Sequence, residues 1–112
     1  MHIEVSTDNS IDGSEALTNH IEVLVKNALV HFGDQITRVE VHLSDANAGK
    51  TGQDDKHCMI EARLEGRQPM AVKHSAATLD QAAKGAADKL KSSLKSTLGR
   101  LRDDAREATR QN

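Results

Sequence analysis

The sequence predicts an α+β fold with the element order β-α-β-β-β-α, in which two helices pack on one face of a four-stranded sheet. Four short segments alternate apolar and polar residues, as strands with one wet face do. Two longer segments repeat apolar residues at three- and four-residue steps, which is typical of amphipathic helices. The length of 112 residues fits one domain, and we expect that domain to span residues 1–102, followed by a polar extension at 103–112.

The first half of the fold combines a strand and a helix. Residues 2–6 predict a strand, because Ile3 and Val5 alternate with polar neighbours. A helix is predicted at 14–32, and Gly33 stands where a left-handed glycine commonly ends a helix. Because a helix joins the first two strands, we expect those strands to be parallel if they are neighbours.

The second half predicts three more strands and a long helix. Alternating apolar and polar residues predict three strands, at 36–43, 57–65 and 70–74. A polar loop at 44–56 separates the first of these three strands from the second. Within that loop, Asp54 and Asp55 are expected to form a solvated turn. Thr78 followed by Gln81 is a capping box that opens the last helix.

Several functional classes are excluded by composition and motifs. No apolar run exceeds three residues, whereas a membrane span needs about 20, and the alternating start is unlike a signal peptide. The single cysteine, Cys58, cannot form an internal disulfide, which favours a reducing cytoplasm. Phosphate-loop, serine-hydrolase and zinc-protease motifs are missing from the sequence, so we predict neither an enzyme nor a cofactor.

The cysteine and histidines are interpreted as structural or solvated. Cys58 belongs to the inward row of its strand, where a thiol acts as a small hydrophobe. His2, His42 and His57 fall on the polar face of the sheet, and neighbouring strands could bring two of them together. Their spacing matches no recognised metal site, so we predict solvated histidines and no metal.

The charge distribution points to nucleic acid. The net charge is −2, yet residues 76–112 hold eight Lys or Arg against five acids, while residues 1–75 hold seven against twelve. At 100° per residue, the cations on one flank of the last helix fall within an arc of about 60°. This flank comprises Lys84, Lys91, Lys95, Arg102 and Arg106, whereas Lys89 lies on the opposite flank. Such a row can follow a phosphate backbone, although solvated lysines partly neutralised by aspartates remain the simpler alternative.

The type of nucleic acid is constrained by the aromatic content. Phe32 is the only aromatic residue and belongs to the apolar stripe of the first helix. A sheet that stacks bases needs surface aromatics, so recognition in the style of an RNA recognition motif is excluded. We therefore predict recognition of shape and phosphate by helix surfaces.

The element order and two local motifs are similar to those of a bacterial family. The motifs are His31-Phe32-Gly33-Asp34-Gln35-Ile36-Thr37-Arg38-Val39-Glu40-Val41-His42-Leu43 and Asp88-Lys89-Leu90. With these, residues 2–102 resemble the ribosome hibernation-promoting factor and ribosome-associated translation inhibitor family, also called sigma-54 modulation proteins. The chain resembles the short form, which lacks the second, dimerising domain of long members, and a monomer is favoured.

The resemblance implies a function and a partner. Members bind the small ribosomal subunit and its ribosomal RNA in the channel used by mRNA and tRNA, silence idle ribosomes under stress, and are not enzymes; neither DNA nor a membrane is implied. By position, the RNA contacts would fall on Lys84, Lys89, Lys91 and Lys95 of the last helix and on Lys26 of the first. The chain departs from the family in its first helix, which carries the acids Glu15 and Glu22 beside a single lysine.

Two other functions stay open on the sequence alone. The same row of cations could bind a different structured RNA, or the sheet face could be a protein-interaction surface. Salt separates these alternatives, because binding through several phosphates weakens steeply as salt rises, whereas a sheet-face protein contact depends on salt much less.

Overall fold

The computed structural model describes residues 1–8, 11, 13–46 and 55–110, with side chains described up to residue 99. Its elements, in chain order, are β1 (His2–Thr7), α1 (Glu15–Ala28), the 3-10 helix η1 (Val30–Phe32), β2 (Ile36–Asp45), β3 (Lys56–Leu64), β4 (Met70–Ala76) and α2 (Leu79–Arg110). This order confirms the predicted α+β class.

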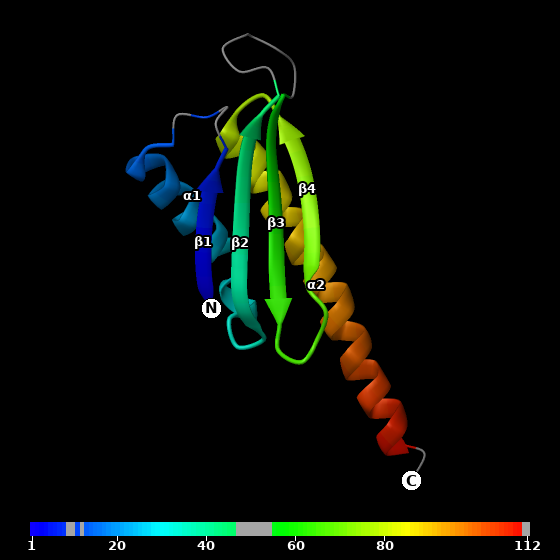
Figure 1. Cartoon of the computed structure of the whole chain (residues 1–112). Helices are drawn as coiled ribbons and strands as arrows, with labels where there is room; N and C mark the ends of the chain where they lie inside the picture. The colour runs from blue at the N-terminus through cyan, green and yellow to red at the C-terminus, as the bar shows by residue number, and fades with distance from the viewer. Residues whose placement is uncertain (9–10, 12, 47–54, 111–112) are drawn as a thin grey trace.

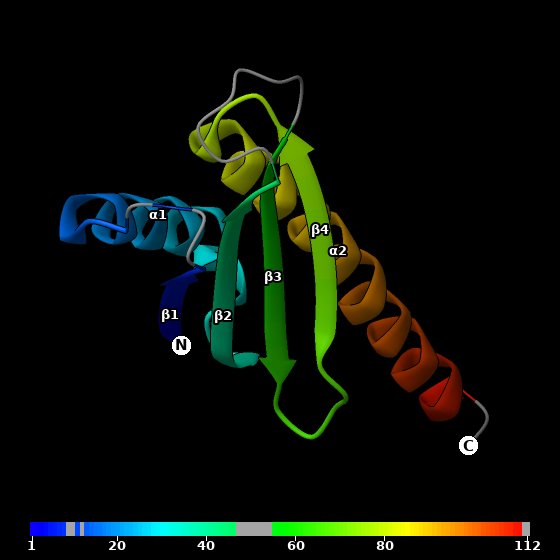
Figure 2. The same ribbon diagram turned by 45° about the horizontal axis from the view of Figure 1, so that its top comes forward.

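The four strands form one mixed sheet in the order β1-β2-β3-β4. β1 is parallel to β2, as predicted, and the other neighbours are antiparallel. Both helices lie behind the sheet in Figure 1, so they cover one of its two faces. Figure 2 shows that no helix covers the opposite face, which we call the open face. The C-terminal part of α2 continues past the end of the sheet (Figure 1).

The core lies between the sheet and the helices and is almost entirely aliphatic. Its largest fully buried side chains include Ile21, Leu29, Leu43, Ile60, Leu90 and Leu94. Cys58 is 1% exposed, and burial raises the pKa of its thiol to about 12, which confirms the prediction of an inward, unreactive cysteine. Four alanines of α2 are also buried, so the helix approaches the sheet closely; they are Ala82, Ala83, Ala86 and Ala87.

Hydroxyl side chains cap both helices at their starts. The Ser14 Oγ accepts a hydrogen bond from the Leu17 amide at 3.1 Å, and the Thr78 Oγ1 accepts one from the Gln81 amide at 3.1 Å. Each bond satisfies an amide that has no partner within its own helix. The second confirms that Thr78 caps the last helix.

The first helix ends earlier than the sequence predicts. α1 stops at Ala28, and η1 follows with hydrogen bonds of the 3-10 type, such as Phe32 amide to Leu29 carbonyl at 2.9 Å. The prediction of a left-handed Gly33 was wrong, because its φ is −56°. The spacing of apolar residues does not reveal the change from α-helix to 3-10 helix, because Phe32 packs against the core in the 3-10 turn as well.

The polar loop is shorter than predicted, and its C-terminal end is buried. β2 extends to Asp45 and β3 begins at Lys56. Asp55 is 4% exposed, so the expectation of a solvated turn was wrong for this residue; Asp54 lies outside the described residues. The cause is the Lys56 Nζ, which lies 3.1 Å from Asp45 Oδ2 and 3.2 Å from Asp55 Oδ1. One lysine thus compensates two largely buried carboxylates.

No helix in the part of the chain that the structure describes combines the length and apolarity needed to cross a membrane.

Candidate nucleic-acid interface

The exposed cations of α2 lie on two flanks, because the buried stripe between them faces the sheet. Leu90 and Leu94 are fully buried, which fixes the rotation of the helix. On the flank that we call the basic flank, Lys84 and Lys95 are exposed and Lys91 is partly buried. Along the axis, Lys84 to Lys95 spans about 17 Å at 1.5 Å per residue.

The basic flank is the side of α2 that is turned toward α1. One turn before Lys84, the Asp80 carboxylate contacts the His20 Nε2 of α1 at 2.6 Å. The Lys84 Nζ lies 3.7 Å from the other oxygen of the same carboxylate. The hydrogen bond with His20 lowers the pKa of Asp80, and the charge of Lys84 lowers it further. Asp80 therefore stays ionised and partly neutralises the start of the basic flank.

Lys91 and Lys95 differ from Lys84 in their electrostatic surroundings. Neither has an ion-pair partner among the residues whose side chains the structure describes. The stem of a partly buried lysine packs on apolar neighbours while its ammonium reaches water. The basic flank is thus least compensated at Lys91 and Lys95.

Lys89 lies on the opposite flank of α2, as the helical angles predict. Its Nζ donates a hydrogen bond to the backbone carbonyl of Lys73 in β4 at 2.9 Å. This contact ties the ammonium to the edge of the sheet. The structure therefore does not bring Lys89 together with the basic flank.

The two remaining predicted residues stand apart. Lys26 is exposed in the last turn of α1, where its charge complements the helix dipole. By helical geometry it points about 120° away from His20, the α1 residue that reaches α2. Arg102 belongs to the projecting part of α2, and its side chain lies outside the described ones.

The histidines on the open sheet face are His2, His42 and His57. No group of three or more His, Cys, Asp or Glu side chains suited to a metal ion occurs among the described residues. Instead, two histidines pair with serines of neighbouring strands: Ser6 Oγ lies 2.8 Å from His42 Nδ1, and Ser75 Oγ lies 2.7 Å from His57 Nδ1. These pairs were not predicted from the sequence, although the outward positions of both partners were a usable signal.

Comparisons with known proteins agree with this architecture. Residues 3–102 match the family model described as Sigma 54 modulation protein / S30EA ribosomal protein. Among solved structures, the N-terminal domain of Thermus thermophilus Protein Y has a TM-score of 0.69 at 21% identity, covering 87% of this chain and 99% of that chain. A ribosomal subunit interface protein from Coxiella burnetii has a TM-score of 0.67 at 17% identity, covering 88% and 99%. No curated protein matches the sequence.

Proposed function

The chain belongs to the sigma-54 modulation protein / S30EA ribosomal protein family, and from this membership we propose that it binds the small ribosomal subunit through the basic flank of α2 and inhibits translation in idle ribosomes. The family is one of ribosome-associated hibernation proteins, which are not enzymes. The partner in this proposal is the ribosomal RNA of the small subunit, and the place of action is the cytoplasm.

The observation that carries the proposal is the uncompensated charge at Lys91 and Lys95. The chain as a whole has a net charge of −2, so these two cations stand out against an acidic protein. A single nucleic-acid strand carries about one charge per 3.4 Å of axis, so the 17 Å of the basic flank can meet several phosphates. The similar protein from Coxiella burnetii is described as a ribosomal subunit interface protein, which supports a ribosomal partner.

The test reverses the two charges in a Lys91→Glu/Lys95→Glu variant. We expect it to fold normally, because both ammonium groups project beside the core. Co-sedimentation with small subunits on a sucrose gradient should fall sharply, since two attractions to phosphate become repulsions. In-vitro translation should lose its inhibition in parallel.

The matched control is Arg63→Glu/Arg67→Glu, which changes the net charge by the same amount. Both arginines are exposed, and neither is on a helix: Arg63 lies on the open face of β3 and Arg67 in the following turn. The control should co-sediment like the parent protein. Equal losses in both variants would show that net charge alone, and not the basic flank, governs binding.

Salt dependence separates the remaining alternatives. Replacing Lys91 or Lys95 by Ala should reduce the slope of log affinity against log salt by roughly 0.7–0.9 for each phosphate that the variant no longer neutralises. An unchanged slope would refute phosphate binding at these residues and leave the open sheet face as the binding surface. Binding to other structured RNAs as strongly as to small subunits would refute ribosomal specificity.

A further inference from the structure

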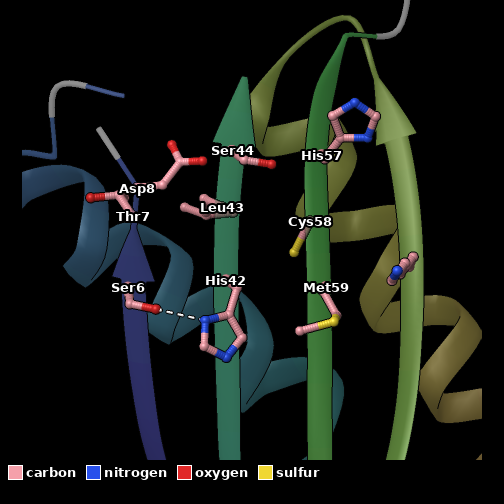
Figure 3. Close-up of a pocket in the computed structure, with 10 residues that line it drawn as sticks. Ser6, Thr7, Asp8, His42, Leu43, Ser44, His57, Cys58 and Met59 are labelled. Atoms are coloured by element: carbon pink, nitrogen blue, oxygen red, sulfur yellow. Dashed lines mark hydrogen bonds between the residues drawn. The ribbon is translucent and has the colours of Figure 1, made fainter. Parts of the chain in front are cut away.

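The open face of the sheet carries a cavity of about 470 Å³ at the carboxyl ends of β1 and β2 (Figure 3). It lies on the side of the sheet away from both helices, so it is separate from the basic flank. Its volume falls in the range of about 300–1,000 Å³ that small-molecule sites occupy.

The register of the strands builds this cavity from two rows of side chains. The first row crosses the whole sheet and consists of Ser6, His42, Met59 and Lys73. The second row lies closer to the carboxyl end of β2; its residues Ser44 and His57 line the cavity, and Ser75 lies beside His57 on β4. Because alternate residues share a face, all of these side chains project from the same open surface. The cavity therefore has an apolar centre at Met59 and polar groups around it.

The charges of the open face are divided between its two ends. At the far end, acids and arginines compensate one another: Arg38 contacts Glu4 at 2.6 Å, and Arg63 contacts Glu61 at 3.5 Å. At the cavity end, Lys73 is exposed and has no ion-pair partner among the described residues. Asp8 supplies the one carboxylate among the side chains that line the cavity. An anionic group is thus favoured next to Lys73 and not elsewhere on this face.

Both histidines of the cavity are already oriented. Each uses its Nδ1 to bond a serine on a neighbouring strand, at 2.8 Å for His42 and 2.7 Å for His57. The Ser6 hydroxyl also lies 3.4 Å from the Val41 carbonyl, which fixes it further. The Nε2 of each ring is then the nitrogen that a ligand can reach. Side chains held in this way lose little rotamer freedom when a ligand binds.

We propose that this cavity binds a nucleoside monophosphate, with its phosphate between Lys73 and His57 and its base over Met59 toward His42. A phosphate suits the one uncompensated ammonium together with a neighbouring imidazole, since hydrogen bonds to an ionised group are the stronger ones. A planar base suits a polarisable thioether beside an imidazole ring. A free nucleotide and a nucleotide within a bound RNA both offer a phosphate and a planar base. The ligand proposed for this cavity is the free nucleotide.

The test uses adenosine 5′-monophosphate as the probe and the full chain as the protein, titrated by calorimetry without RNA. One saturating site is expected, and inorganic phosphate and adenosine should each bind more weakly than the complete nucleotide. Lys73→Gln should raise the Kd of the nucleotide about tenfold or more. Met59→Ala should raise it about fivefold while leaving the Kd of inorganic phosphate unchanged.

Two controls keep the inference separate from the ribosomal function. Arg63→Gln, in the compensated part of the same face, should leave nucleotide binding unchanged. The Lys91→Glu/Lys95→Glu variant should also bind the nucleotide normally, even where its ribosome binding is abolished.

Each contrary result overturns the site. It is refuted by a lack of saturation up to about 10 mM nucleotide, or by equal affinity for nucleotide and inorganic phosphate. It is equally refuted if Arg63→Gln weakens binding as much as Lys73→Gln does, or if amide NMR shifts induced by the nucleotide fall on α2 instead of β1–β4.

Discussion

Replacing Gly85 by Ala should destabilise the protein, although the same change elsewhere in a helix is stabilising. Gly85 lies in the second turn of α2, against the inward-facing ring of His74 on β4. A Cβ at this position would lie 2.0 Å from the His74 Cδ2 and 2.3 Å from its Nε2. Both distances are far shorter than van der Waals contact, so the ring or the helix must move.

The magnitude follows from two opposing effects. In a helix interior, Ala is favoured over Gly by about 0.5–1 kcal/mol, because it restricts the unfolded chain. Overpacking a well-filled core costs about 1–3 kcal/mol. The clash with His74 should therefore outweigh the helix preference, and we expect a net loss of up to about 2.5 kcal/mol in the free energy of unfolding.

The matched control is Gly99→Ala in the same helix. A Cβ there meets nothing within 4 Å, so only the helix preference remains and this variant should gain about 0.5–1 kcal/mol. Truncating His74 to Ala removes the obstacle. In that background Gly85→Ala should change sign and become stabilising, with a coupling of about 1–3 kcal/mol between the two sites.

Urea unfolding of the four proteins of this cycle, followed by circular dichroism, measures the coupling. The slopes with urea should agree, so that midpoints report stability. Steric conflict between position 85 and His74 is refuted if Gly85→Ala stabilises the parent protein as Gly99→Ala does. It is also refuted if Gly85→Ala has the same effect with and without the His74 ring.

Three further predictions test the core at Ile60, the ion pairs of Lys56 and the burial of the Cys58 thiol. Ile60→Ala should lower the free energy of unfolding by about 2–5 kcal/mol. By contrast, Lys73→Ala on the open face should change it by less than about 0.5 kcal/mol, and equal urea-measured losses would contradict a one-sided core. Lys56→Met should lower the Tm at neutral pH, because it removes the cation that two largely buried carboxylates share. The hydrogen bonds that the Lys56 ammonium donates to Asp45 and to Asp55 raise the pKa of Lys56. Its contribution to stability is therefore present at neutral pH and disappears as the pH rises above about 10.4 through the folded value. A Tm unchanged by the substitution would contradict this pairing. Cys58 should resist a thiol reagent at pH about 8 until urea unfolds the protein, and rapid labelling of the native state would contradict its burial.

Much of the fold could be predicted from the sequence, because local patterns carry the information. Alternation at Val39, Val41 and Leu43 marks a strand with one buried face, and these three residues are buried in the structure. The capping box at Thr78 marks the start of α2 within one residue. The parallel pairing of β1 with β2 follows from the helix that connects them.

The candidate interface could be predicted only in part. Helical angles alone place Lys84, Lys91 and Lys95 on one flank of α2 and Lys89 on the other. Which flank faces α1 depends on the contact between His20 and Asp80, residues 60 positions apart in the chain. No local pattern contains that contact.

Local sequence patterns predict which residues face inward, because the periods of a strand and a helix are fixed by backbone geometry. Which residues become neighbours depends on how the segments pack together. The register between strands sets Ser6 beside His42, and the packing of α2 on β4 sets Gly85 against His74. The same holds for Lys56, which lies between two aspartates where the loop begins and ends. These contacts depend on how the segments are placed relative to one another. The packing of the whole core sets that placement, whereas the order of residues within one segment does not.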